Sequence, residues 1–397
     1  MDLIASGNIR DRSTLMWSLR RHFAFLVRHL TLRRAWNCAL CVAEMVAKRA
    51  VLRSHPFYLR VAVADTCNLR CPGCLLGQEP SARILPGATL ALPIKADQDK
   101  CDAPSVPKPL MPFDLFVKSV TPLLPFLLKV NLYDQGEPLL NPDLPRMISF
   151  LRYHNISSCV SSNFSLRLSD EKLTALLLSG LEHLIVAIDG VTPESYKMYR
   201  KRGDLELVLS NIRRLVALRE RLGITSLVLD LQFIEFEHNM NERSQALLLA
   251  RELGADRHTV IQGSSLEGWI GNRFRGTEEE RREAGCYQAW VSTHIDSEGA
   301  VKLCDYGNDH GMPAIGQAHE CVSSAVRNND FAVAVRGTFG NKNSHLKEWC
   351  RTCSLYRVAP HNGASLQDET QSANRLHQID LRLGEPTGGV RPGNRRK

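Results

Sequence analysis

The apolar residues of this chain follow two different periods. Between residues 57 and 263, short apolar runs that are typical of strands alternate with longer stretches in which apolar residues recur every three or four positions, as in helices. Strands alternating with helices form a parallel sheet with the helices outside it. We therefore expect an α/β fold, a partial (β/α)6 TIM-like barrel, with its chemistry at the carboxyl ends of the strands. The predicted strands are 57–66, 127–134, 156–162, 183–189, 226–234 and 257–263, and the predicted helices are 142–153, 169–179, 204–222 and 241–253.

The segments around this barrel have other patterns. Residues 13–53 repeat apolar positions at helical spacing, with arginines between them. After the barrel, alternating apolar residues around Asp296 and Gly299 predict a hairpin in a second, small domain. The end of the chain is rich in Gly, Arg and Asn, which predicts disorder. The predicted divisions are a basic helical arm at 1–55, a core at 56–264 with a surface insertion at 77–112, a cysteine-containing domain at 265–356 and a disordered tail at 357–397.

Charge is concentrated in the arm. Of the 50 Lys and Arg and 42 Asp and Glu residues, 11 basic and 3 acidic ones lie in residues 1–60, which leaves 39 of each sign for the rest. A neutral body argues against a nucleic-acid partner. Without a signal-peptide pattern or a membrane-spanning run, we expect a cytoplasmic protein. The arm predicts either peripheral membrane contact, with Trp17 and Phe23 near its apolar side, or packing of that side on the barrel.

Three cysteines, Cys67, Cys71 and Cys74, lie on one loop after the first predicted strand. Twelve clustered cysteines in a cytosolic chain favour metal binding over disulfides. A structural zinc site needs four ligands, and a ferredoxin-type cluster needs a fourth cysteine and a C-x2-C-x2-C spacing. Three thiolates at C-x3-C-x2-C instead suit a [4Fe-4S] cluster with one iron left open to a small molecule.

The segment CNLRCPGC at 67–74 strongly resembles the cysteine loop of the radical S-adenosylmethionine (SAM) enzymes. The resemblance implies a [4Fe-4S] cluster whose open iron chelates S-adenosyl-L-methionine. It also implies one-electron cleavage of that cofactor to a 5′-deoxyadenosyl radical, which abstracts hydrogen from substrate, with a flavodoxin- or ferredoxin-type electron donor. The family often has an aromatic residue before the last cysteine. Gly73 stands there in this chain, so we expect altered packing of the adenine.

Further segments at successive strand ends match the same family. Gly136-Glu137-Pro138 resembles its GE segment, which holds the methionine ammonium by its backbone and a charge-assisted carboxylate contact, although Gln135 stands where Gly is usual. The resemblance implies further cofactor contacts at the third and fourth strand ends and just beyond, with Arg200 facing the cofactor carboxylate. The implied cofactor-binding residues are Gly136, Glu137, Pro138, Ser162, Asn163, Asp189 and Arg200.

The fifth predicted strand carries the candidate catalytic residues. Gln232 and Glu235 lie near its carboxyl end, where substrate contacts belong, and a base there would deprotonate a substrate radical. The alternative for each is a polar residue of the barrel rim.

A second cysteine set, Cys286, Cys304, Cys350 and Cys353, suits zinc or a closed [4Fe-4S] cluster, and spacing alone does not choose. Next to a radical SAM core the layout resembles the twitch domain, which is related to the SPASM domain. This resemblance implies one auxiliary [4Fe-4S] cluster that accepts or relays an electron. The pair Cys38 and Cys41 predicts only helix packing.

Taken together, the sequence predicts a radical SAM oxidoreductase that oxidises a small hydroxylated or sugar-like molecule. The alternatives are a peptide- or protein-modifying maturase of ribosomal peptides, or an epimerase with Cys159 or Cys321 as thiol donor. The alternative from another class is a zinc-stabilised binding protein without catalysis.

Overall fold

The structure of the chain is a computed structural model. It describes residues 27–74, 76–77, 110–134, 136–263, 286–304, 312–318, 324–341, 345–347, 350 and 377–380. The predicted insertion at 77–112 and the first half of the predicted helical arm, with Trp17 and Phe23, lie mostly or wholly outside these residues.

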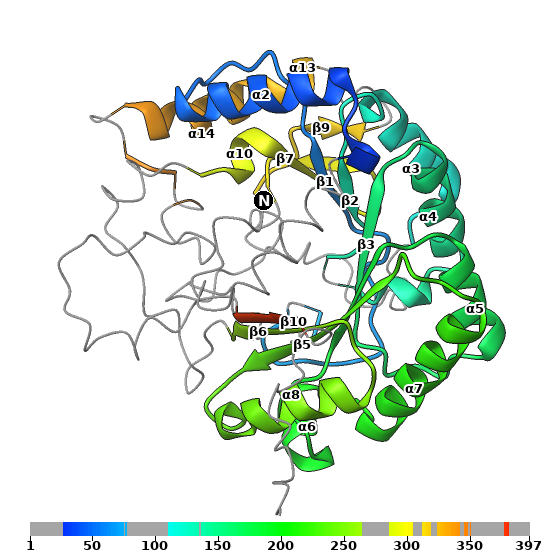
Figure 1. Cartoon of the computed structure of the whole chain (residues 1–397). Coiled ribbons are helices and arrows are strands. Elements are labelled where there is room, and N and C mark those ends of the chain that lie inside the picture. Colours follow the sequence, from blue (N-terminus) through cyan, green and yellow to red (C-terminus); the bar gives the residue numbers. More distant parts are fainter. Residues whose placement is uncertain are drawn as a thin grey trace, which may run out of the picture.

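Six strands follow one another in the sheet in chain order, and all six are parallel (Figure 1). The sheet is open, because β9 and β10 end it on its two sides. The predicted α/β fold with a partial barrel is therefore confirmed. The strands are β1 (Tyr58–Val61), β2 (Lys129–Asn131), β3 (Ser157–Ser162), β4 (His183–Ala187), β5 (Val228–Glu235) and β6 (Arg257–Gln262).

Helices cover the outer side of the curved sheet (Figure 1). Apolar side chains of strands and helices, such as Val160, Leu184 and Ile212, form the fully buried core between the two layers. The start of α5 is capped, since the Ser169 hydroxyl accepts a hydrogen bond from the Lys172 amide. The helices are α3 (Phe113–Val120), α4 (Leu144–Tyr153), α5 (Asp170–Leu178), α6 (Pro193–Tyr199), α7 (Leu205–Arg221) and α8 (Arg243–Glu252), with 3-10 turns η2 (Thr121–Leu123), η3 (Pro138–Leu140) and η4 (Met240–Glu242).

The residues after the barrel extend the same sheet. The predicted hairpin is formed by β7 (Ser292–Ile295) and β8 (Ala300–Lys302), with Gly299 at a φ of 86° in the turn. Strand β7 pairs in parallel with β1, on the side opposite β2. The remaining elements are α10 (Gln288–Val291), β9 (Gly316–Gln317), α13 (Ser324–Arg327), α14 (Asp330–Gly340) and β10 (His377–Asp380).

Strand β10 lies inside the predicted disordered tail at 357–397. It pairs antiparallel with β6, whose outer edge offers unpaired backbone groups. Composition alone does not reveal such pairing, because it depends on an edge made elsewhere in the chain.

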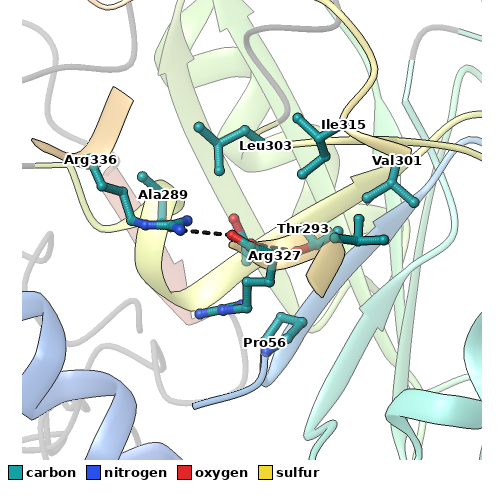
Figure 2. A pocket seen from close by; sticks show the side chains of 10 residues that line it. Pro56, Ala289, Thr293, Val301, Leu303, Ile315, Arg327 and Arg336 are labelled. Atoms are coloured by element: carbon teal, nitrogen blue, oxygen red, sulfur yellow. Dashed lines mark hydrogen bonds between the residues drawn. The ribbon is translucent and has the colours of Figure 1, made fainter. Parts of the chain in front are cut away.

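The arm contains a helical turn at 27–29 and α2 (Leu32–Val46), which runs along the rim of the molecule (Figure 1). The predicted helix over 13–53 is therefore interrupted at 30–31 and ends early. Buried arginines join the end of this arm to the second region: Arg336 donates to the Ala50 carbonyl at 2.6 Å and to the Ala289 carbonyl at 3.4 Å. Figure 2 shows Arg336, Ala289 and Arg327 around one pocket. Arg327 contacts Cys41 of α2, so that thiol packs as the sequence predicted. None of the described helices is both long and apolar enough to cross a membrane.

Candidate active site

A cavity of about 300 Å³ opens at the carboxyl ends of β1 to β5. Loops that follow different strands meet there, as the topology of a partial barrel requires. Its lining includes the cysteine loop and most of the residues predicted to bind cofactor. The lining residues are Cys67, Leu69, Cys71, Gly73, Cys74, Leu76, Gly77, Tyr133, Asp134, Gly136, Glu137, Ser161, Ser162, Asn163, Ala187, Tyr199, Arg200, Gln232 and Ile234.

All three loop cysteines border this cavity. Two backbone hydrogen bonds hold the loop: the Glu137 amide donates to the Thr66 carbonyl at 2.8 Å, and the Arg70 amide donates to the Lys201 carbonyl at 3.0 Å. Among the described residues no group of three His, Cys, Asp or Glu side chains could hold a metal ion as placed. Each cysteine of a [4Fe-4S] cluster binds a different iron, so such a cluster does not require the three thiols to meet around one ion.

The sulfur atoms already have polar donors around them. The Leu69 amide lies 3.4 Å and the Asn163 amide group 3.6 Å from Cys67 Sγ, and Arg200 Nη1 lies 3.8 Å from Cys71 Sγ. Burial raises the pKa of Cys67 to about 12 and also raises the pKa of Cys71. Both thiols are thus protonated near neutral pH, and binding iron would release their protons. N–H donors of this kind stabilise the thiolates that iron binding requires.

Glu137 is 1% exposed, and its carboxylate joins two strand ends. One oxygen accepts hydrogen bonds from the Leu139 amide at 3.0 Å and the Ser162 hydroxyl at 2.7 Å. The other accepts one from the Asn163 amide at 2.8 Å. Burial raises the pKa of Glu137, and these three donors oppose that shift. The carboxylate oxygens still have lone pairs left for a cation in the cavity.

Asp189 and Arg200 form a buried ion pair beside the loop. Arg200 Nε lies 2.5 Å from Asp189 Oδ2, and the Ile234 amide donates to Asp189 Oδ1 at 2.8 Å. Burial alone would lower the pKa of Arg200, but Asp189 and Cys71 together raise it well above its ordinary value. Arg200 lines the cavity and Asp189 does not, so the aspartate holds the guanidinium against the cysteine loop. Pro138 likewise lies outside the lining, at the first position of η3.

Two close approaches shape the site. A Cβ atom on Gly136 would lie 1.9 Å from the Ala64 carbonyl oxygen, so only glycine lets the two loops meet there. A Cβ atom on Gly73 would lie 2.9 Å from the Tyr199 hydroxyl. The half-buried Tyr199 ring, from α6, therefore lies against the loop position where the resemblance led us to expect an aromatic residue.

Part of the cavity wall was not singled out by the sequence analysis. Tyr133 and Asp134 follow β2 and line the cavity. Arg60 Nη1 lies 3.7 Å and His294 Nε2 3.6 Å from the Asp134 carboxylate, and the Arg60 guanidinium lies 5.1 Å from the centre of the Tyr133 ring. The sequence signal that could have identified Tyr133 and Asp134 was their position directly after a strand. Their partners Arg60, on β1, and His294, on β7, could be identified only once the sheet topology was known.

The two candidate catalytic residues, Gln232 and Glu235, do not lie at the same site. Gln232 lines the cavity, and Glu235 does not. Side chains alternate along a strand, so Glu235 points away from the side taken by Gln232 and Ile234. Its carboxylate lies 4.0 Å from Arg243 Nη1 of α8.

The second cysteine set is described in part. Cys286, Cys304 and Cys350 are half-buried and pack against the main core, and Cys353 lies outside the described residues. Cys286 and Cys304 stand at either end of the segment that contains α10 and the β7–β8 hairpin.

Comparison with known proteins points in one direction. No known family profile matches the chain. It is 24% identical over 211 residues to GTP 3′,8-cyclase 1 of Mycobacterium tuberculosis, which covers 50% of this chain and 49% of the cyclase. It is 27% identical over 197 residues to PqqA peptide cyclase of Gluconobacter oxydans, which covers 46% of this chain and 50% of that enzyme. The chain thus spans about half the length of these curated relatives.

A solved structure shares the fold. The crystal structure of SuiB from Streptococcus suis superposes with a TM-score of 0.53 at 13% identity, over 81% of this chain and 79% of SuiB. The fold, the curated relatives and the three-cysteine loop at the end of the first strand agree with one another. The chain thus resembles the radical S-adenosylmethionine enzymes in its cysteine loop, and it shares its fold with SuiB.

Proposed function

We propose that the protein binds a [4Fe-4S] cluster through Cys67, Cys71 and Cys74 and cleaves S-adenosyl-L-methionine reductively. The supporting observation is that the three thiols, Glu137 and Arg200 line one cavity at the strand ends. Held by these three cysteines, such a cluster would supply the electron for cleaving the sulfonium, which in the enzymes this chain resembles gives a 5′-deoxyadenosyl radical that abstracts hydrogen from substrate. A flavodoxin- or ferredoxin-type protein is the proposed source of that electron.

The residues around the thiols fit such a cluster. Three thiolates leave one iron without a protein ligand, and the cavity beside them has room for a small molecule. Positive charge on Arg200 and N–H groups near Cys67 and Cys71 compensate the negative charge of thiolates in a buried place. The set has no fourth cysteine on the same loop, which is the ligand that a closed site would need.

Within this proposal the chain's own residues bind and orient the cofactor. Glu137 keeps lone pairs for the methionine ammonium while its other contacts fix the ends of β2 and β3. Arg200, held by Asp189, would bind the methionine carboxylate. Tyr199 offers an aromatic face beside Gly73 for the adenine.

For the substrate, the polar cavity wall is the main support. Tyr133, Asp134 and Gln232 offer hydroxyl, carboxylate and amide groups, which suit a small hydroxylated or sugar-like molecule. An oxidation would send one electron from the substrate radical to an auxiliary [4Fe-4S] cluster held by Cys286, Cys304, Cys350 and Cys353 in a twitch-like region. Glu235 has no part in this proposal, because it points away from the cavity.

A second candidate is modification of a peptide side chain. It is supported by the similarity to PqqA peptide cyclase. The two candidates differ in which molecule loses hydrogen to the deoxyadenosyl radical. Deuterated amino sugars or polyols and deuterated peptides would each be tested for transfer of the label into 5′-deoxyadenosine.

The core proposal is tested by iron content and cofactor cleavage after anaerobic reconstitution. We expect about eight irons per chain, and about four in either a Cys67→Ala/Cys71→Ala/Cys74→Ala variant or a variant lacking the four downstream cysteines. With dithionite, only chains that keep the first three cysteines should form 5′-deoxyadenosine. Zinc in place of iron, or equal cleavage by both variants, would contradict the proposal.

A further inference from the structure

Helix α2 presents a continuous apolar stripe to the outside. Leu32, Trp36 and Val46 are 93%, 74% and 73% exposed, and the exposed Ala39 and Ala43 lie between them. These five residues, which we call the α2 stripe, follow spacings of four and three, so they share one side of the helix. Soluble surfaces expose single apolar side chains, and a row of this kind marks a contact surface.

The side of α2 that faces the protein is polar, and its side chains form hydrogen bonds with the rest of the chain. Arg34 donates to the carbonyls of His29, Leu124, His154 and Asn155, at distances between 2.6 and 3.2 Å. Further along the helix, Asn37 exchanges hydrogen bonds with the backbone of His55, at 2.8 and 2.9 Å.

The last turns of α2 are fastened in the same way. Glu44 accepts hydrogen bonds from the Arg53 and Ser54 amides and from the Ser54 hydroxyl, and Cys41 donates to the Trp290 carbonyl at 2.9 Å. Polar contacts thus fix the orientation of the helix, with its apolar side outward. Packing on the barrel would have turned the apolar side inward, so that alternative is wrong for α2. Peripheral membrane contact, the other alternative, stays a prediction.

The charges around the α2 stripe have one sign. Arg28, Arg33, Arg49 and Arg53 are exposed. Between residues 27 and 57 the sequence has a single acidic residue, Glu44, which is 4% exposed. Arg28 pairs with Glu182 at 3.3 Å. The outer surface of this segment is therefore apolar and basic, with its excess positive charge on Arg33, Arg49 and Arg53.

We propose that the α2 stripe and its flanking arginines bind an anionic lipid bilayer and hold the enzyme flat against it. An interfacial helix inserts its apolar side to the level of the headgroups, with Trp at that boundary and basic residues on lipid phosphates. Charge complementarity favours lipid over a second copy of this chain, because an isologous contact would bring the arginines of both copies together. This inference does not depend on the proposed reaction.

The test is flotation of the full-length, reconstituted protein with lipid vesicles. Vesicles of phosphatidylcholine would be compared with vesicles that contain about one third phosphatidylglycerol. We expect the protein to float only with the anionic vesicles. Leu32→Glu/Trp36→Glu should lower the bound fraction at least about tenfold, and Arg33→Gln/Arg49→Gln should weaken binding to anionic vesicles.

The chain offers a matched control. Leu178 on α5 and Leu248 on α8 are 58% and 62% exposed, so Leu178→Glu/Leu248→Glu makes the same chemical change on other helices. This variant should float like the wild type, and all variants should share its unfolding temperature. The proposal is wrong if the wild-type protein stays unbound or if the control loses as much binding. It is also wrong if light scattering shows that Leu32→Glu/Trp36→Glu only dissociates a dimer.

Discussion

Gly73 and the hydroxyl of Tyr199 lie so close that a Cβ atom on the glycine would come within 2.9 Å of the phenolic oxygen. The contact joins the cysteine loop to α6, an element that the apolar pattern did not predict. The Tyr199 ring also lies against Phe236, with ring centres 4.3 Å apart, and 5.4 Å from the Arg200 guanidinium. Loop, tyrosine and arginine therefore form one packed unit at the cavity.

This contact predicts the effect of a single methyl group. Gly73→Ala should weaken binding of S-adenosyl-L-methionine about tenfold, because either the cysteine loop or the packed Tyr199 ring must move. Tyr199→Phe removes the oxygen that the methyl group meets. In that background Gly73→Ala should therefore cost much less, as equilibrium dialysis of the reconstituted protein would show. Equal losses in both backgrounds would mean that the two residues are independent.

Glu137 gives a second prediction. In Glu137→Gln the amide nitrogen replaces one carboxylate oxygen and faces an N–H or O–H donor, so about 1–3 kcal/mol of stability should be lost. Ser162→Ala removes one donor and leaves the carboxylate, so it should cost less, about 1 kcal/mol. Urea unfolding measures both. If Glu137→Gln unfolds like the wild type, the carboxylate does not join β2 to β3 in the way described.

The Asp189–Arg200 pair predicts strong coupling. Asp189→Asn or Arg200→Met alone leaves one buried charge without its partner, at a cost of about 3–5 kcal/mol. The double variant removes both charges and should lose clearly less than the sum of the two. A double-mutant cycle by urea unfolding measures the difference. An additive result would show that the two side chains do not interact.

Glu182 predicts a dependence of stability on pH. Burial alone would raise the pKa of Glu182, but hydrogen bonds from His29, at 3.1 Å, and Ser157, at 2.7 Å, outweigh burial and lower it. A carboxyl group with a lowered folded-state pKa stabilises the fold above its unfolded pKa, about 4.3, and loses that effect as pH falls through the folded value.

Glu182→Gln should therefore be less stable than the wild type by about 1–3 kcal/mol at pH 7, with the gap closing below about pH 4. Urea unfolding at both pH values measures it. Glu220→Gln, on the exposed side of α7, should show no such gap. A gap that stays constant with pH would exclude this role for the Glu182 charge.

Periodicity predicted the barrel well because each strand and helix is long enough to repeat its pattern. All six predicted strands and the helices α4, α5, α7 and α8 are present within a few residues. Helix α6 was missed because seven residues give too short a repeat. Its start did carry a signal, since Thr192 and Ser195 form a capping box ahead of Tyr199.

The site was harder to predict where a residue's direction matters. The motifs at successive strand ends predicted residues that lie close together, and the three thiols, Glu137 and Arg200 line one cavity. Gln232 faces the cavity and Glu235 does not, because side chains alternate along β5. To predict which of the two faces the cavity, one must know the register of β5. A strand that is buried on both sides does not reveal its register in the sequence. The orientation of α2 was unpredictable for a related reason, because its polar side is satisfied by backbone groups distant in sequence.

The position of β1 has a consequence for how the protein is made. Strand β1 lies between β2 and β7, and β7 begins only at Ser292. While the ribosome is still adding the later residues, one side of β1 keeps its backbone groups unpaired and open to neighbouring nascent chains. The strand that leads into the cysteine loop is therefore fully paired only after synthesis has passed Ile295, more than 200 residues later.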